Sequence, residues 1–379
     1  MVHDWLVAQR GGEHVLLQLA RLFPEAPIYT LVHAKGSADP EIEAHPIRTS
    51  FIQSLPGVPH TFRPYLPLFA AAIETFDLKA FDLILSTSHC VAKGVRLRTG
   101  QVHLAYIHTP MRYLWDQLAE YLPQIPGRHL LEPPVRLLTA PLRHWDVTSS
   151  RRPTRLIANS EFVAGRIKRV WGRNADVVYP PVDVDYFARA RRVARRGFLV
   201  VSALVAYKRV DLAVALATRS LLDLTVVGDG PELPRLRAMA GPTVRFVGSL
   251  GPAELRQAYA GARALLFCGV EDFGIVPVEA MATGCPVIAL QEGGALETVK
   301  AFGKTPTGVF FREPSLAAID DAVRRFEVLE AEGAFARDVL LAHARRFSSD
   351  RFVAGFTAIL DQYARGSAPT PEKPSQPAG

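Results

Sequence analysis

Residues 264–289, ALLFCGVEDFGIVPVEAMATGCPVIA, decide the expected fold because they alternate strand and helix patterns. Ala264–Phe267 is a short apolar run typical of a buried strand, and an acidic loop follows it. Pro277–Gly284 predicts a short helix that ends at glycine, and Pro286–Ala289 is a second apolar run. A strand, a helix and another strand in this order are typical of an α/β protein with a parallel sheet.

The same alternation extends over the rest of the chain and favours an α/β architecture throughout. Apolar residues at helical spacing predict helices over, for example, Gly12–Phe23, Asp211–Arg219 and Pro252–Ala260. Only Met1 and Val2 precede His3, so either the first strand is very short or the start of the chain is misassigned. The other expected strands are Pro27–Val32, Phe81–Ser86, Val102–Ile107, Arg155–Ala158, Phe198–Ser202, Asp223–Val227 and Val244–Val247.

The length of 379 residues exceeds what a single hydrophobic core usually holds, so two domains are expected. Tyr179-Pro-Pro-Val-Asp-Val-Asp185 suits the boundary, because paired prolines continue neither a helix nor a central strand. The expected domains are therefore residues 1–180 and 181–347, followed by an amphipathic helix over about 348–365. Residues 366–379 are rich in proline, serine, alanine and glycine and are expected to form a disordered tail.

Composition limits the classes of partner. The net charge of +7 favours anionic partners such as phosphates, nucleotides or an acidic lipid surface. The cations are too dispersed for a nucleic-acid-binding arm, so no nucleic-acid partner is expected. The three cysteines, Cys90, Cys268 and Cys285, lack a Cys-x-x-Cys spacing and lie among apolar residues, which favours core positions over zinc or disulfides. No signal peptide and no apolar run of about 20 residues is present, so a cytoplasmic location is expected.

Glu271 and Glu279 are separated by seven residues, a spacing that suits a ligand with hydroxyl groups at both ends. At a rise of about 1.5 Å per helical residue, they would lie roughly 6–12 Å apart, similar to the distance from hexose to ribose in a sugar nucleotide. One carboxylate would accept hydrogen bonds from the sugar and the other from the ribose. Free amides near Gly274 and Ile275 at the helix start would face phosphate oxygens. The alternative is a solvated acidic loop followed by an ordinary helix glutamate.

Three further segments offer backbone or charge to a phosphate-containing ligand. In Arg10-Gly11-Gly12-Glu13, two glycines at a helix start let a ligand approach the backbone. Lys208 and Arg209 follow an expected strand and suit a diphosphate. Gly228-Asp-Gly-Pro231 is a tight turn whose backbone could line a base pocket. The alternatives are an ordinary strand–helix turn, a surface cation pair and a purely structural turn, respectively.

Histidines follow two expected strands of the first domain. His108-Thr-Pro-Met-Arg-Tyr-Leu-Trp-Asp116 combines a histidine, an arginine and two large aromatic residues, which suits a sugar site better than a core. His89 also follows a strand, but it is as readily a structural residue. Because open α/β sheets bind ligands beyond the carboxyl ends of their strands, the site is expected in a cleft between the two domains.

These motifs together resemble family 4 of the retaining glycosyltransferases, which have the GT-B fold of two Rossmann-like domains. The resemblance runs from His3 to about Tyr363. It is carried by Glu271-x7-Glu279, Lys208 after its strand, Gly228-Asp-Gly-Pro231, Asn159-Ser160 and Tyr179-Pro-Pro-Val-Asp183. Within that family, His3-Asp-Trp-Leu6, His108–Asp116 and Tyr207-Lys-Arg-Val-Asp211 look like the bacterial mannosyltransferases of O-antigen lipopolysaccharide and exopolysaccharide synthesis, which typically use GDP-mannose.

The resemblance implies roles for the two domains and their residues. Residues 1–180 would bind the acceptor, with the last helix crossing back onto them, and residues 181–347 would bind the donor. Glu271 would hold the donor hexose, Glu279 the ribose and Lys208 the diphosphate. Backbone of Phe273, Gly274 and Ile275 would contact sugar and phosphate, Gly11 and Gly12 the donor diphosphate or the acceptor, and His108 the donor sugar. Catalytic roles would thus fall on His108, Glu271 and Lys208, and no metal is expected.

One position departs from the family pattern. Many members have Gly-Arg a few residues before the lysine, where this chain has Ser202-Ala203. Arg209 would then take over phosphate binding, or diphosphate binding is weaker, or the donor differs.

The expected activity is the transfer of a hexose, with mannose from GDP-mannose as the first choice, to a saccharide or lipid-linked saccharide for cell-surface polysaccharides. The alternatives are a UDP-sugar-dependent transferase, a non-catalytic partner that binds sugar nucleotides, and a sugar-nucleotide epimerase. The segment His60–Phe69 mixes apolar groups with a cation, which suits a peripheral contact with the inner face of the cell membrane. The alternative for that segment is the entry to a core-packed helix.

Overall fold

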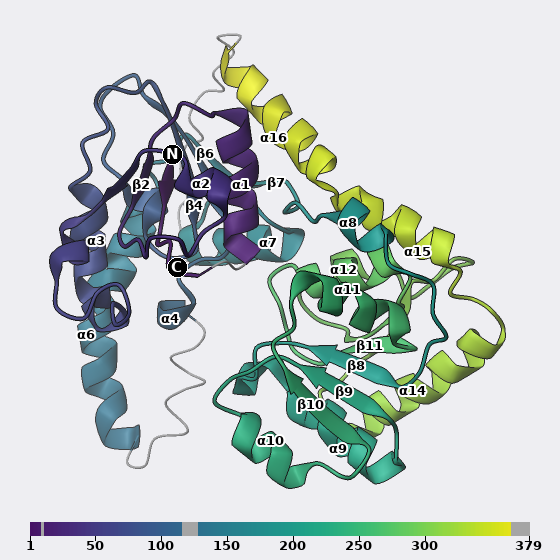
Figure 1. The fold of residues 1–379 in the computed structure, drawn as a ribbon. Coiled ribbons are helices and arrows are strands. Elements are labelled where there is room, and N and C mark those ends of the chain that lie inside the picture. Colours follow the sequence, from purple (N-terminus) through teal and green to yellow (C-terminus); the bar gives the residue numbers. More distant parts are fainter. Residues whose placement is uncertain (9–10, 116–127, 365–379) are drawn as a thin grey trace. The chain divides into compact units, whose positions relative to one another are not determined.

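A computed structural model describes residues 1–8, 11–115 and 128–364, and the expected tail lies outside them. The chain divides into two compact units. Unit 1 comprises Met1–Tyr179 and Val353–Gly379, and unit 2 comprises Pro180–Phe352. Each unit contains one parallel β-sheet with helices packed around it (Figure 1).

Unit 1 holds a seven-stranded sheet in the order β3-β2-β1-β4-β5-β6-β7, and neighbouring strands pair in parallel throughout it. The first strand is very short: Val2 and His3 pair with Tyr29 and Thr30 on one side and with Ser86 and Thr87 on the other. The strands are β1 (Val2–His3), β2 (Ile28–Thr30), β3 (Ile47–Thr49), β4 (Leu83–Ser88), β5 (Val102–Ile107), β6 (Arg155–Ala158) and β7 (Asp176–Val177).

The helices of unit 1 cover both faces of this sheet. Leu16 and Leu17 of α1 pack with Ile28 and Ile42 on one face, while Phe69 and Ile73 of α3 pack with Tyr29 and Ile84 on the other. The α-helices are α1 (Gly11–Leu22), α2 (Pro40–Glu43), α3 (Leu66–Glu74), α4 (Arg112–Trp115), α6 (Arg128–Ser149) and α7 (Glu161–Trp171). The 3-10 helices are η1 (Phe51–Ser54), η2 (Arg63–Tyr65) and η3 (Ala92–Gly94). Helix α16 (Ser349–Ala364) begins in unit 2 and continues in unit 1 from Val353.

A buried ion pair joins η3 to α6 in unit 1. Lys93 Nζ lies 2.6 Å from Asp146 Oδ1, and both side chains are almost fully buried. The indole nitrogens of Trp115 and Trp171 each donate a hydrogen bond to Asp146 Oδ2 at 2.8 Å. The Lys93 ammonium also stacks on the rings of Trp145 and Trp171. These contacts satisfy both buried charges, which would otherwise carry a large desolvation cost.

Unit 2 holds a six-stranded parallel sheet in the order β10-β9-β8-β11-β12-β13. Its strands are β8 (Phe198–Val201), β9 (Leu224–Val227), β10 (Val244–Gly248), β11 (Ala264–Phe267), β12 (Val287–Leu290) and β13 (Gly308–Phe311). Its α-helices are α8 (Val184–Ala188), α9 (Val210–Ser220), α10 (Leu233–Met239), α11 (Pro252–Gly261), α12 (Ile275–Thr283), α13 (Ala295–Thr298), α14 (Leu316–Ala331) and α15 (Arg337–Ala344). Two 3-10 helices, η5 (Ala206–Lys208) and η6 (Arg345–Phe347), complete it.

The sequence predicted a helix that begins at Pro277, but helix α12 begins two residues earlier, at Ile275. Gly274 is its N-cap with φ of 89°, so Ile275 is the first helical residue and Pro277 lies within the first turn. Proline is tolerated there because the first-turn amides have no partner inside the helix. The helix ends at Gly284 with φ of 95°, where the sequence predicted its end.

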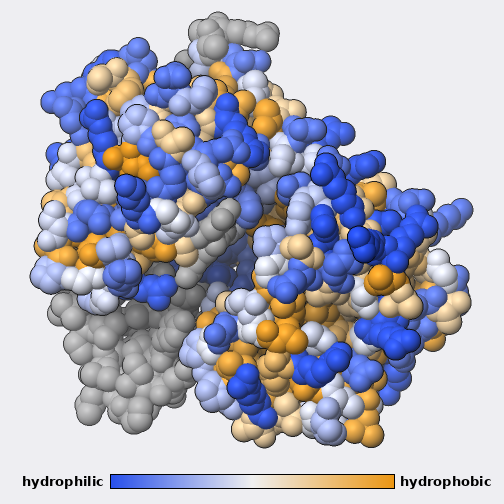
Figure 2. Space-filling model, in the orientation of Figure 1, coloured by the Kyte–Doolittle hydropathy of each residue, from blue (hydrophilic) through white to orange (hydrophobic). Residues whose placement is uncertain are grey.

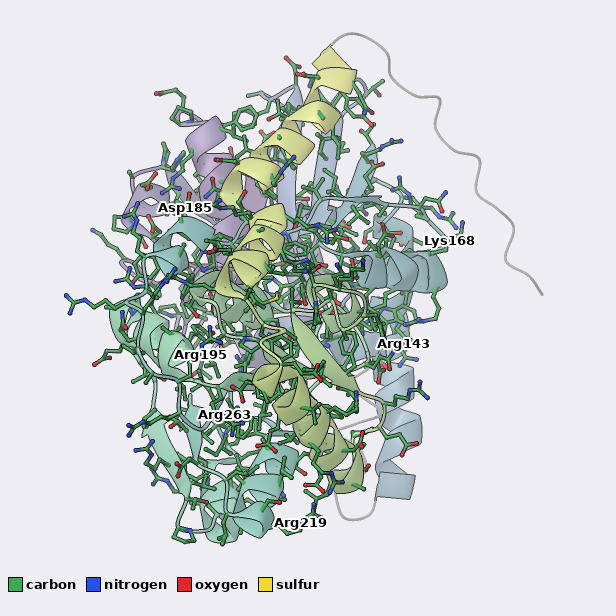
Figure 3. The ribbon with its side chains drawn as sticks, turned by 90° about the vertical axis from the view of Figure 1, so that its right-hand side faces the viewer. Arg143, Lys168, Asp185, Arg195, Arg219 and Arg263 are labelled. Carbon is green, nitrogen blue, oxygen red and sulfur yellow. The ribbon has the colours of Figure 1, made fainter. Side chains whose placement is uncertain are left out.

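The surface carries its cations on many separate elements. Figure 3 labels Arg143 on α6, Lys168 on α7, Arg219 on α9 and Arg263 before β11. Cys90, Cys268 and Cys285 are buried free thiols, as the sequence predicted. Among the helices of residues 1–8, 11–115 and 128–364, none combines the length and apolar character needed to cross a bilayer.

Candidate active site

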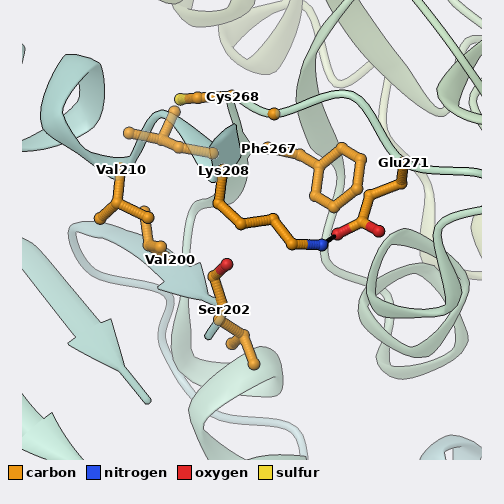
Figure 4. Close-up of a pocket in the computed structure, with 10 residues that line it drawn as sticks. Val200, Ser202, Lys208, Val210, Phe267, Cys268 and Glu271 are labelled. Carbon is orange, nitrogen blue, oxygen red and sulfur yellow. Dashed lines mark ion pairs between the residues drawn. The ribbon is translucent and has the colours of Figure 1, made fainter. Parts of the chain in front are cut away.

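Lys208 and Glu271 form an ion pair in a pocket of unit 2 (Figure 4). Lys208 is in η5 after β8, and Glu271 is in the loop after β11. Strands β8 and β11 are parallel neighbours, so both side chains lie at the carboxyl edge of the sheet. The pocket is also lined by Val200, Ser202, Val210, Phe267, Cys268 and Gly269. The structure therefore brings together a cation and a carboxylate that the sequence assigned to one ligand.

Two local features hold Lys208 in this pocket. A Cβ on Gly269 would lie 2.7 Å from Lys208 Cα, so only glycine lets the loop after β11 approach η5 this closely. Arg209 follows in the left-handed region with φ of 50°, which is uncommon for a residue with a side chain. Gly269 was not predicted, because its role depends on a contact between segments far apart in the sequence.

The loop that carries Glu271 is held by a pair of glycines from another segment. Gly294 N donates a hydrogen bond to the Glu271 carbonyl at 2.8 Å. A Cβ on Gly294 would overlap the backbone of Phe273, and Gly293 has φ of 68° beside the Glu271 carbonyl. Phe273 itself is buried against Phe347. Gly293 and Gly294 thus set the position of this loop, a role that their sequence context did not indicate.

Glu279 lies on α12, outside the ring of residues that lines the Lys208–Glu271 pocket. Its Oε2 accepts a hydrogen bond from the hydroxyl of Tyr259 on α11 at 2.8 Å. Burial raises the pKa of Glu279 to about 7, although the hydrogen bond from Tyr259 acts in the opposite direction. Glu279 is therefore protonated more readily near neutral pH than an ordinary glutamate.

The Arg209 guanidinium is directed at Asp211, with Nε 3.1 Å from Oδ1. Ser202, at the end of β8, lines the pocket, and its hydroxyl donates to the Ala203 carbonyl at 2.9 Å. Arg209 was expected to bind phosphate in place of the arginine that many family members have before the lysine. To do so, its guanidinium would have to exchange Asp211 for a phosphate.

The turn at Gly228 crosses the end of β8. Leu204 N donates to the Asp229 carbonyl at 2.9 Å, and Gly228 N donates to the Gly248 carbonyl at 2.7 Å. A Cβ on Gly228 would overlap the Ser202 carbonyl, so glycine is needed for this close approach. Gly228 thus has a structural role in this tight turn, and its role toward a base stays a prediction.

His108 follows β5 in unit 1 and faces the start of α1. A Cβ on Gly12 would lie 3.5 Å from His108 Nε2, so the ring stands directly over the backbone of this helix start. Burial, together with the charges of neighbouring His89 and His3, lowers the pKa of His108 to about 3. His108 is thus neutral at physiological pH. Gly11 begins the same helix, while Arg10 and Asp116 lie outside the described residues.

Asp4 organises the loop after β4. Its Oδ2 accepts the amides of His89 and Cys90, and its Oδ1 those of Val91 and Ala92, all at 2.7–2.8 Å. His89 Nδ1 lies 3.3 Å from the same carboxylate, and its ring stands edge-on to Trp5. These contacts support the alternative that His89 is a structural residue. In the sequence Asp4 stands out only as part of His3-Asp-Trp-Leu6, and nothing in that motif indicates this role.

Two family models match consecutive segments of the chain. Residues 9–186 match Glycosyltransferase Family 4, and residues 187–334 match Glycosyl transferases group 1. The chain is therefore similar to a family 4 glycosyltransferase domain in its first part and to a group 1 glycosyltransferase domain in its second. These domains correspond closely to units 1 and 2.

Curated relatives with sequence similarity include enzymes that use GDP-mannose. A GDP-mannose-dependent alpha-mannosyltransferase of Mycobacterium tuberculosis is 32% identical over 212 residues, which are 51% of this chain and 53% of that protein. One from Mycolicibacterium smegmatis is 35% identical over 148 residues, 38% of this chain and 39% of the relative. A GDP-mannose-dependent alpha-(1-6)-phosphatidylinositol monomannoside mannosyltransferase of M. tuberculosis is 34% identical over 43% of this chain and 50% of its own. The chain thus spans about half or less of the length of these relatives.

Solved structures show the same fold over almost the whole chain. Sucrose-phosphate synthase from Thermosynechococcus elongatus has a TM-score of 0.71 at 16% identity, covering 97% of this chain and 100% of that one. Anabaena HepE in complex with UDP has a TM-score of 0.66 at 15% identity, covering 95% and 99%. With its two parallel-sheet α/β units, the chain has the GT-B fold that the sequence predicted.

Proposed function

We propose that this chain is a retaining glycosyltransferase that moves mannose from GDP-mannose to a saccharide or lipid-linked saccharide of a cell-surface polysaccharide. The ion pair between Lys208 and Glu271 is the observation that carries this proposal. An ammonium group, which suits phosphate oxygens, here lies beside a carboxylate, which suits sugar hydroxyls, at the sheet edge where α/β folds bind ligands. The names of the GDP-mannose-dependent relatives support mannose as the hexose.

In the proposed complex, the donor separates the ion pair. The Lys208 ammonium exchanges the Glu271 carboxylate for diphosphate oxygens, and Glu271 then accepts hydrogen bonds from hexose hydroxyls. Amides at the start of α12, beyond Gly274, face the phosphates, and Glu279 takes the ribose diol. Arg209, Gly228 and the backbone of Phe273 and Ile275 are assigned to the same donor.

The proposed reaction breaks the bond between the anomeric carbon and the diphosphate oxygen, and it forms a bond from that carbon to the acceptor oxygen on the same face. Negative charge grows on the departing diphosphate, where Lys208 stabilises it electrostatically. The acceptor proton passes to the diphosphate oxygen, so no protein base is required. The roles of His108, Gly11 and Gly12 toward donor or acceptor stay predictions from the family resemblance.

A UDP-sugar donor is the second candidate, because HepE, which shares the fold, was solved in complex with UDP. The proposed recognition of hexose, diphosphate and ribose does not depend on the base. A non-catalytic partner would bind nucleotide without turning it over, and an epimerase would convert the donor without an acceptor.

Thermal unfolding in the presence of GDP, UDP, ADP and their sugar conjugates tests the choice of donor. A nucleotide at a hundredfold excess over its Kd stabilises the folded state by about 2.7 kcal/mol, and we expect this effect with GDP and GDP-mannose alone. For a domain of this size the melting temperature should rise by several degrees. A rise with UDP only would replace mannose by a UDP-sugar, and no rise with any nucleotide would contradict the proposal.

We further propose that unit 1 meets an anionic membrane surface through the segment 44–73. This segment contains no aspartate or glutamate. Phe62 and Phe69 pack into the core. Phe51 and Leu68, in contrast, are 45% and 42% exposed, and Arg63 is exposed as well. Figure 2 shows this side of unit 1, around α3, as a mosaic of hydrophobic and hydrophilic residues. Exposed apolar side chains beside cations suit the interface of an anionic bilayer.

Sedimentation with vesicles tests this surface. We expect the protein to bind vesicles rich in phosphatidylglycerol and to bind neutral phosphatidylcholine vesicles much less, because Arg63 attracts the anionic headgroups. Phe51→Ser combined with Leu68→Ser should weaken binding about tenfold through lost apolar burial. Leu221→Ser, which removes an exposed leucine of unit 2, is the matched control. Equal sedimentation of the double variant and the unsubstituted protein would contradict this proposal.

A further inference from the structure

Tyr259 lies beneath the carboxylate assigned to the ribose. The tyrosine is on α11 with a relative exposure of 0%, and its hydroxyl donates to Glu279 Oε2 on α12 at 2.8 Å. Helices α11 and α12 pack directly against each other in unit 2. Within the described part of the chain, Glu279 Oε1 has no hydrogen-bond partner of its own. One carboxylate oxygen is thus fixed by the protein and the other remains for a ligand.

We propose that Tyr259 is a positioning residue for nucleotide recognition, which orients Glu279 and favours its ionised form so that the carboxylate accepts the ribose diol. This inference rests on the proposed function, because it assumes that a nucleoside diphosphate binds to unit 2. A phenol donates a single hydrogen bond to a carboxylate. The hydrogen bond from Tyr259 therefore favours one rotamer of Glu279 and also favours its charged form. The residue itself touches no substrate in this scheme.

The surroundings of Glu279 explain why the hydroxyl matters. Burial favours the neutral form of Glu279, and the hydrogen bond from Tyr259 is the influence that favours the charged form. Cys285 lies near Tyr259, and its thiol stays protonated because burial raises its pKa to about 12. Arg337 of α15 and Arg195 lie at the Gly284 end of α12. Nucleotide affinity should therefore be sensitive to the Tyr259 hydroxyl.

The direction of the pH dependence follows from the raised pKa of Glu279. A ribose diol donates two hydrogen bonds, which the carboxylate accepts and the protonated acid accepts poorly. Below a pKa of about 7, binding must first remove the proton, so affinity falls by up to tenfold per pH unit. Above that pKa affinity reaches a plateau. Removing the Tyr259 hydroxyl raises the pKa of Glu279 further and moves this midpoint upward.

Calorimetric titration with GDP between pH 6 and 8.5 tests the proposal, with UDP as the probe if the unsubstituted protein binds UDP instead. Tyr259→Phe should weaken binding at pH 7 about tenfold, the size expected for a hydrogen bond to a charged group. It should also shift the pH midpoint of affinity upward. Tyr186→Phe is the matched control, because Tyr186 is in the same unit and its hydroxyl makes no hydrogen bond within the described residues.

A nucleotide without the diol separates positioning from a general structural effect. With 2′,3′-dideoxy-GDP, the unsubstituted protein and Tyr259→Phe should bind with equal, low affinity. If Tyr259→Phe weakened both nucleotides by the same factor and left the pH midpoint unchanged, the proposal would be overturned while the proposed function stood. If the unsubstituted protein bound none of these nucleotides, the proposed function would fail first, and the role of Tyr259 with it.

Discussion

Replacing Glu271 by alanine is expected to lower the rate of hexose transfer about a hundredfold to a thousandfold, the range for losing one preorganised polar group at a reaction centre. The carboxylate would hold the sugar while positive charge develops at its anomeric carbon. Without it, the hexose loses both an orienting hydrogen-bond acceptor and a compensating charge. Donor turnover with GDP-mannose, or with the UDP-sugar that stabilises the protein, measures the effect.

Controls separate this effect from damage to the fold. The Lys208 ammonium loses its partner in Glu271→Ala, but its flexible stem lets it reach water, so the far-ultraviolet circular dichroism should stay unchanged. Glu313→Ala removes an exposed glutamate of the same unit and should leave turnover unaltered. Glu271→Gln keeps an acceptor oxygen and should retain more activity than Glu271→Ala. A turnover of Glu271→Ala close to that of the unsubstituted protein would remove Glu271 from its assigned role.

The strands that the sequence predicted are mostly short runs rich in apolar residues. Val102–Ile107 and Ala264–Phe267 were found with the predicted bounds, because central strands of a parallel sheet are buried on both faces. The missed strands β3, β7 and β13 lie at sheet edges. Strand β3 reads Ile-Arg-Thr and is largely exposed, and β7 has two residues, so neither leaves an apolar signal. Strand β13 is buried but follows an irregular loop.

The candidate site was predictable where residue type alone indicates chemistry. Lys208 and Glu271 follow neighbouring strands, and parallel strands bring their carboxyl ends to one edge, so their meeting could be anticipated. The contributions of Gly269 and Gly294 could not, because each depends on how closely another segment passes. The same holds for Tyr259, whose sequence neighbourhood is that of an ordinary amphipathic helix.

Asp4→Ala should destabilise unit 1 by at least about 3 kcal/mol, because three buried amides and one part-buried amide lose their acceptor and each buried one costs about 1–3 kcal/mol when unsatisfied. Urea unfolding followed by tryptophan fluorescence measures unit 1 selectively, since Trp5, Trp115, Trp145 and Trp171 all lie in it. Asp77→Ala, which removes a surface carboxylate that accepts one amide, is the control and should cost about 1 kcal/mol or less.

Acid provides an independent test of the same carboxylate. Burial alone would raise the pKa of Asp4, but His89, the backbone amides and His3 outweigh it and hold the pKa below its ordinary value. A carboxyl with a lowered pKa in the folded state stabilises it above the unfolded value of about 3.9, and this contribution disappears as the pH falls through the folded pKa. The unsubstituted protein should therefore lose unit 1 stability steeply below about pH 4, whereas Asp4→Ala lacks that component. Parallel pH profiles for the two proteins would show that the loop after β4 does not depend on the charge of Asp4.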